Sequence, residues 1–130
     1  MAHGREPLPP DRWAEEEAYL EGIRLFNALK FWESHEAWEE IWLCADGVHA
    51  EFLQGLIQAA AALLKYQRDE PAPALRLYDS AMARLNLCQN KYMGLDVRGF
   101  QECMRVCFEP VIGGPYRPID ETRIPKIQTS

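Results

Sequence analysis

The chain has 130 residues and a formal net charge of −6, from 20 acidic and 14 basic side chains. This length is typical of one domain that buries its core without disulfides. The acidic balance disfavours binding to nucleic acid or to anionic membrane surfaces, because phosphate recognition needs concentrated Lys and Arg. No apolar run reaches the ~20 residues that cross a bilayer, and the N-terminus lacks the apolar core of a signal peptide. We therefore expect a cytoplasmic protein.

The cysteines form no CxxC pair; they are Cys44, Cys88, Cys103 and Cys107. Cys103 and Cys107 lie one helical turn apart in an apolar pattern, a spacing at which two thiols can bind a metal ion. Separated cysteines in a chain of this kind are more often small core residues. We therefore interpret them as core residues.

The N-terminal part of the chain predicts a flexible segment followed by a first helix. Residues 1–10 are polar and contain three prolines. Asp11 is a suitable N-cap, and Tyr19, Ile23 and Phe26 follow at helical spacing. A helix is therefore predicted from Asp11 to about Ala28.

The stretch FWESHEAWEEIW, residues 31–42, predicts a second helix that ends near the Asp46-Gly47 stop signal. At ~100° per residue, one side of this helix is mainly apolar. That side carries Phe31, Ser34, Trp38, Ile41 and Trp42. His35 and Glu39 fall inside the same arc, and Glu36 lies at its margin. An imidazole and a carboxylate are therefore expected to face the interior.

Residues 48–66 predict a third helix whose apolar side chains cover more than half of its circumference, which is typical of a helix deep in a bundle. Gln54 and Gln58 lie on its narrow polar strip. Gly55 costs ~1 kcal/mol against Ala in mid-helix, so it indicates a close contact with a neighbouring helix.

Two more helices and a tail complete the prediction. Pro71 and Pro73 begin a fourth helix, and Asp96 caps a fifth after a linker that contains Gly94. From residue 110 onward, prolines and glycines indicate an extended tail that lies over the bundle through Val111, Ile112 and Tyr116 and is free beyond about Thr122. No segment alternates with period two over strand length, so no sheet is expected.

The predicted fold is all-α: a compact bundle of four to five antiparallel helices with an extended C-terminal tail. Residues 1–10 are assigned to the flexible segment, residues 11–109 to the bundle domain and residues 110–130 to the tail.

A family resemblance rests on three segments of the chain: NALKFWESHEAWEEIW, FLQGLIQAAAALLKY and ALRLYDSAMARL. Together they resemble the small bacterial and archaeal proteins of domain-of-unknown-function family 309. The resemblance covers residues 25–85 and implies a compact helical bundle without an assigned activity. The positions that match the family pattern are His35, Glu36, Glu39, Trp42, Gln54, Gly55 and Gln58. Where the family usually has a glycine just before the aromatic pair, this chain has Leu29, which would be strained if that position needs a positive φ.

The HExxE pattern permits a metal site or acid–base catalysis. His35 and Glu39 would be the metal ligands and Glu36 the candidate base, as on the HExxH helix of zinc peptidases. The chain offers too few further ligands, so we expect no metal and no cofactor. A metal-free His35–Glu39 dyad lacks a matching nucleophile.

A structural interpretation of the same residues is a buried polar clasp. His35 and Glu39 would bind each other and Gln54 or Gln58 across two helices, because buried polar groups need hydrogen-bond partners. Trp32 lies nearer the edge of its helix and could line a pocket or a subunit interface.

Two functional hypotheses follow. One is a non-enzymatic module that self-associates, as a homodimer, or binds a protein or small ligand. The alternative is a small metal-dependent hydrolase that uses the HExxE helix.

Overall fold

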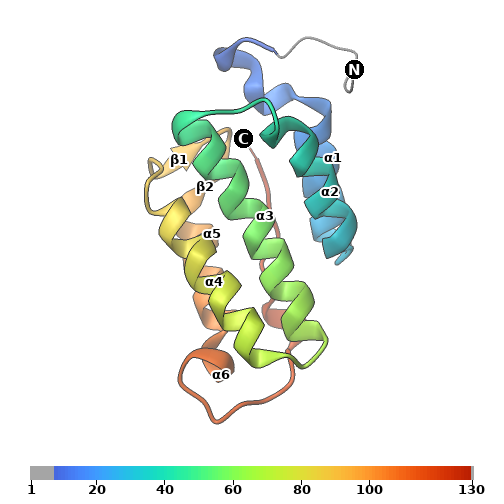
Figure 1. Cartoon of the computed structure of the whole chain (residues 1–130), viewed down its shortest axis with the longest axis vertical. Helices are drawn as coiled ribbons and strands as arrows, with labels where there is room; N and C mark the ends of the chain where they lie inside the picture. Colours follow the sequence, from blue (N-terminus) through green and yellow to red (C-terminus); the bar gives the residue numbers. More distant parts are fainter. Residues whose placement is uncertain (1–7, 130) are drawn as a thin grey trace.

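The computed structural model describes residues 8–129, which form an α-helical bundle (Figure 1). Four helices make up most of it: α1 Glu17–Asn27, α2 Phe31–Trp42, α3 Gly47–Gln67 and α4 Pro71–Leu85. Two further α-helices follow, α5 Val97–Cys107 and the short α6 Glu109–Ile112, and two 3-10 helices lie at η1 Pro10–Glu15 and η2 Glu121–Arg123. The predicted all-α class is confirmed. Of the flexible segment predicted at residues 1–10, residues 1–7 lie outside the described part.

Helix α3 is the centre of the bundle, with α2 on one side of it and α4 on the other (Figure 1). Helix α1 packs on α2, so each of the first four helices contacts the next along the chain. Phe52, Leu53, Leu56 and Leu63 on α3 are completely buried. The nearly all-round apolar pattern of α3 thus predicted its position correctly, since burial on two sides needs apolar residues on two sides.

Two glycines allow the helices to approach closely. A Cβ at Gly55 would lie 2.8 Å from side-chain atoms of Leu85 on α4, which confirms the close contact predicted there. A Cβ at Gly22 on α1 would lie 2.1 Å from Nε1 of Trp38 on α2. The Trp38 N–H donates to the carbonyl of Tyr19 at 3.1 Å, so the indole lies against the α1 backbone.

The first helix begins later than predicted. Residues from Pro10 to Glu15 form the 3-10 helix η1, and Glu16, with φ −60° and ψ 127°, separates it from α1. The predicted helix from Asp11 is therefore wrong in its first turn. Trp13 explains the break, because its ring stacks on His49 at the start of α3, with 3.7 Å between ring centroids.

A small hairpin occupies the predicted linker before α5. Its strands, β1 Lys91–Tyr92 and β2 Leu95–Asp96, pair antiparallel, and Met93 and Gly94 between them both have positive φ. Such a turn joins a two-residue hairpin. Strands of two residues are too short to show alternation in the sequence. Asp96 caps α5 as predicted, accepting a hydrogen bond from the amide of Gly99.

The tail beyond α6 is bound to the bundle for most of its length, and the expectation that it is free beyond Thr122 is wrong. Ile124 and Ile127 are buried. The amide side chain of Asn27 donates to the carbonyl of Ile127 at 2.9 Å and accepts from its N–H at 2.8 Å. In Figure 1 the tail runs behind α3 back toward α1.

The cysteines divide into two kinds. Cys88 and Cys107 are buried, as predicted for core residues, whereas Cys44 and Cys103 are exposed, so the core interpretation is wrong for these two. No helix in the described part of the chain has the length and hydrophobicity that a bilayer crossing needs.

Candidate functional site

Trp32 and His35 form an aromatic stack on the outer side of α2. Their ring centroids are 5.2 Å apart and their planes differ by 14°. Trp32 is 54% exposed, which is unusual for the largest apolar side chain. The two residues are three apart on the helix, so they project from the same side. Trp32 has no ring contact other than His35 among residues 8–129, so most of its exposed area is free for a partner.

The carboxylate of Glu39 continues this arrangement by one helical turn. Its Oε2 lies 3.6 Å from Nε2 of His35, an ion-pair distance rather than a short hydrogen bond. Nδ1 of His35 is buried and has no hydrogen-bond partner in the described part of the chain. The tautomer with its proton on Nε2 suits this geometry, because the N–H then faces the Glu39 carboxylate.

Three more carboxylates of α2 point to solvent: those of Glu33, Glu36 and Glu40. Among residues 8–129, none of them has an ion-pair partner. At the end of the helix, Leu43 is 65% exposed. The side of α2 that faces solvent is therefore acidic, with one exposed apolar side chain near each end.

The glutamines of α3 lie elsewhere, and the predicted clasp between them and His35 is wrong. Oε1 of Gln58 accepts hydrogen bonds from Ser80 Oγ at 2.8 Å and from Arg84 Nε at 3.1 Å, both on α4. Gln54 is half-buried, and its side chain has no hydrogen bond to any of residues 8–129. Helix α3 is apolar on both buried sides, so the sequence could not show which neighbour its polar strip borders.

His35 is also less buried than expected, with 21% of its side chain exposed. The core-facing residues of α2 are Phe31, Ser34 and Trp38, while Trp42 is half-buried and packs on the edge of the core. His35 therefore lies at the margin of the apolar arc, and its ring stacks on that of Trp32.

The residues described contain no group of three His, Cys, Asp or Glu side chains that could hold a metal ion. His35 and Glu39 alone would supply two ligands, whereas zinc in proteins takes three or four. His49, the other histidine in this part of the chain, is held elsewhere. Its ring stacks on Trp13, and its Nδ1 lies 3.3 Å from the hydroxyl of Tyr92. Burial lowers the pKa of His49, so this imidazole favours its neutral form.

The cluster of Trp13, His49 and Tyr92 was not predicted from the sequence. It joins three segments that are far apart in the chain, and none of them carries a periodic pattern that points to the others. Its contacts are one stacked and one tilted ring pair with one polar contact, which suits holding η1 and the hairpin to the start of α3.

A family described as "Domain of unknown function (DUF309)" matches residues 19–77, from α1 into α4. A conserved hypothetical protein from Thermus thermophilus, known from a crystal structure, is 36% identical to this chain. The likeness covers 68% of this chain and 92% of that one, with a TM-score of 0.61. This chain belongs to the DUF309 family. A search among functionally curated proteins found no match.

The match to DUF309 includes all of α2 and α3, and so includes Trp32, His35, Glu36 and Glu39. It ends before α5, α6 and the tail. The arrangement on α2 contains a rigid exposed ring and several free carboxylates but, in the described part of the chain, no nucleophile in contact with His35. Chemically, it suits recognition of a cation better than bond cleavage.

Proposed function

We propose that this DUF309 protein is a non-enzymatic binding module and that its α2 face binds a basic segment of a partner protein. The α2 face is defined here as the solvent-facing side formed by Trp32, Glu36, Glu39 and Leu43. The observation that carries the proposal is the exposed Trp32 ring, stacked on His35 and flanked by the carboxylates of Glu33 and Glu36, which have no ion-pair partners among residues 8–129.

The stacked ring is well suited to be the anchor of an interface. Tryptophan is enriched among the residues that dominate binding energy. The His35 ring restricts the rotation of Trp32, so less side-chain entropy is lost when a partner covers it. Arginine guanidinium groups stack on aromatic planes and bind carboxylates through the same planar edge. An arginine over the open face of Trp32 would have Glu36 within the next helical turn.

Charge favours a basic partner over a second copy of this chain on the same surface. If two α2 helices packed antiparallel, the carboxylates of Glu36 and Glu39 would face those of the other copy, and like charges repel. The whole chain carries −6, which favours association with basic segments. The homodimer expected from the sequence stays a prediction, and we propose that it uses another surface.

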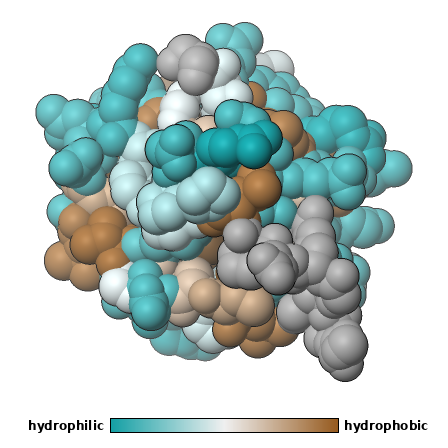
Figure 2. Space-filling view, turned by 90° about the horizontal axis from the view of Figure 1, so that it is seen from above, coloured by the Kyte–Doolittle hydropathy of each residue, from teal (hydrophilic) through white to brown (hydrophobic). Residues whose placement is uncertain are grey.

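Other exposed apolar side chains lie at the end of the bundle where α2 ends and α3 begins. Val48 is 47% and Leu87 62% exposed. Seen from above, the apolar surface at this end is divided by polar side chains instead of forming one wide patch (Figure 2). We therefore do not assign a dimer interface there. The cytoplasmic location likewise stays a prediction.

Two synthetic helical peptides test the proposal. One carries Arg and Leu at helical spacing, and its matched control carries Glu in place of every Arg. Titrated into the protein by calorimetry, the Arg peptide should bind and the Glu peptide should not, and added salt should weaken binding. Trp32→Ala should lower the affinity about tenfold or more, the size typical of an anchor residue. Leu87→Ala, an equally exposed apolar residue on another surface, should leave the affinity unchanged.

Binding that is equal for Trp32→Ala and Leu87→Ala would refute the assignment of the α2 face. No binding of the Arg peptide, or equal binding of both peptides, would refute the basic partner. The hydrolase alternative is tested separately, because zinc near one equivalent per chain, lost on His35→Ala, would support it.

A further inference from the structure

A second candidate site lies where the tail turns back over α6. A pocket of about 130 Å³ opens there, lined by Tyr66, Cys107, Pro110, Arg117, Pro118, Asp120 and Arg123. Of these, Tyr66 alone belongs to the region matched by the DUF309 family. The other lining residues come from α5, α6 and the tail, so this pocket is built mainly by the part of the chain outside the family match.

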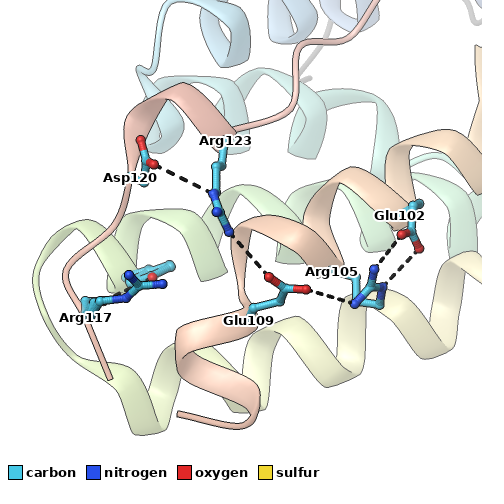
Figure 3. A network of polar contacts seen from close by, with 7 residues as sticks. Glu102, Arg105, Glu109, Arg117, Asp120 and Arg123 are labelled. Carbon is cyan, nitrogen blue, oxygen red and sulfur yellow. Dashed lines mark hydrogen bonds and ion pairs between the residues drawn. The ribbon is translucent and has the colours of Figure 1, made fainter. Parts of the chain in front are cut away.

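Two guanidinium groups reach this pocket. Figure 3 shows Arg123 between Asp120 and Glu109, with Arg117 nearby on the extended part of the tail. Arg123 Nη1 lies 3.4 Å from Glu109 Oε1, and its Nε lies 3.7 Å from Asp120 Oδ2. These long contacts leave several of its five N–H donors unused. The guanidinium of Arg117 has no ion-pair or hydrogen-bond partner among residues 8–129.

The backbone that carries Arg117 is held in place. The Tyr66 hydroxyl donates to the carbonyl of Arg117 at 3.1 Å. One residue earlier, the Tyr116 hydroxyl donates to Asp69 Oδ1 at 2.6 Å, which ties the tail to the turn between α3 and α4. A guanidinium on a fixed backbone needs less ordering when a ligand binds.

The one carboxylate in the pocket lining, that of Asp120, already accepts hydrogen bonds from a neighbouring residue. Oδ1 of Asp120 accepts from the N–H of Thr122 at 3.0 Å and from its hydroxyl at 2.6 Å. These hydrogen bonds hold the pKa of Asp120 below its usual value, so it is ionised at neutral pH. Burial raises the pKa of the Cys107 thiol to about 12, so this thiol is neutral. Two cations and one anion give the lining residues a formal charge of about +1, and this charge is centred on Arg117 because Arg123 is shared between Asp120 and Glu109.

The remaining walls are apolar. Pro110 and Pro118, the ring of Tyr66 and the neutral Cys107 thiol offer no free charge to a ligand. A cavity of this size admits only a few heavy atoms, since one of ~150 Å³ holds a benzene ring. The lining thus combines a single net positive charge with room for a short hydrocarbon group.

We propose that this pocket binds a small monocarboxylate, with Arg117 as the main contact to the carboxylate and Arg123 as the second. A planar carboxylate matches the fork of a guanidinium in two parallel hydrogen bonds. A phosphate dianion fits less well, because its second charge would lie near Asp120. The proposal does not depend on the binding function assigned to the α2 face, which shares no residue with this pocket.

Titration followed by two-dimensional ¹H–¹⁵N NMR tests the site with three probes. Propionate has the charge and a short apolar group, propionamide has the same shape without charge, and inorganic phosphate has charge without the apolar group. At constant ionic strength, propionate should shift the amide signals of residues 107–123 in a saturable way. Propionamide and phosphate should bind at least fivefold more weakly.

The variants separate specific binding from a general salt effect. Arg117→Gln should weaken propionate binding at least fivefold, and the fold should persist because this side chain is exposed. Arg76→Gln, an exposed arginine on α4, is the matched control and should bind like the unmodified chain. Shifts that do not saturate, that are unchanged in Arg117→Gln, or that propionamide reproduces would overturn the site. Tighter binding of phosphate would overturn the ligand class.

Discussion

Leu29 ends α1 in a backbone conformation that normally belongs to glycine. Its φ is +64°. The N–H of Leu29 donates to the carbonyl of Phe26, and the N–H of Lys30 donates to that of Leu25, both at 2.9 Å. This pair of hydrogen bonds defines a Schellman motif with Leu29 at the position where glycine is usual. For an L-residue with a Cβ, this conformation costs roughly 1–2 kcal/mol.

Replacing Leu29 by Ala and by Gly separates this strain from side-chain packing. Leu29 is half-buried and packs against the core, so either truncation should cost about 1 kcal/mol, roughly half the value for a fully buried Leu. Ala keeps the strain, whereas Gly removes it. The Gly variant is also destabilised by about 0.5–1 kcal/mol relative to the Ala variant, because glycine gives the unfolded chain more conformational freedom. The Gly variant should therefore be the more stable of the two by about 0.5–1 kcal/mol.

Urea denaturation followed by circular dichroism measures this difference, and thermal unfolding should show it as about 2–5 °C. The control is Ala61→Gly in the middle of α3, where the order should be reversed and Gly should cost about 1 kcal/mol. If Leu29→Ala proved as stable as Leu29→Gly or more so, the positive φ would store no strain and the reasoning would fail.

Four further substitutions and one labelling experiment test the packing of the bundle. Gly22→Ala should lower the free energy of unfolding by about 3 kcal/mol, because its Cβ would overlap the Trp38 ring. Gly113→Ala, where a Cβ meets no atom within 4 Å, should have little effect. Urea denaturation of both variants measures the difference. Asn27→Ala should lower the free energy of unfolding by about 1–3 kcal/mol, because it leaves the backbone N–H and carbonyl of Ile127 without their partner. Amide hydrogen exchange should then become faster at residues 124–127 but not in α3. Cys44 and Cys103 should react with a thiol reagent at pH 8, while Cys107 reacts only on unfolding. The folded state raises the pKa of Cys107 to about 12. That thiol's contribution to the free energy of unfolding should therefore be complete below the unfolded pKa of ~8.5 and fall as pH rises toward 12. Between these pH values, Cys107→Ala should lose less of its free energy of unfolding than the unmodified chain, as urea denaturation at several pH values would show.

Much of the helical architecture follows from local signals. The apolar pattern of α3 predicted its central position, and Asp96 was recognised as the cap of α5. Gly55 was recognised as a close contact, and Leu29 as a position at risk of strain. The first three depend on a residue's own conformational preference or on a pattern within one helix, so no knowledge of the partner segment is needed, whereas the Leu29 prediction came from the family resemblance, in which glycine is usual there.

The candidate site on α2 was predicted only in part. Helical spacing correctly placed His35 and Glu39 side by side, because residues four apart lie on the same side of any α-helix. The spacing could not show that Trp32 covers the His35 ring from outside, since that depends on side-chain rotamers. Nor could it show that Gln58 faces Ser80 and Arg84, because α3 has an apolar neighbour on each side.

What the sequence by itself determined is therefore the five longer α-helices, the Asp96 cap and the side of each helix that is apolar. The tertiary structure alone decided which polar residues meet, where Trp13 stacks, and that Ile124 and Ile127 hold the tail on the bundle. Two isolated isoleucines in a segment with prolines form no periodic pattern, so their burial depends on a groove made by other helices. Local periodicity reflects hydrogen bonding within a few residues, whereas these contacts join residues up to 100 positions apart.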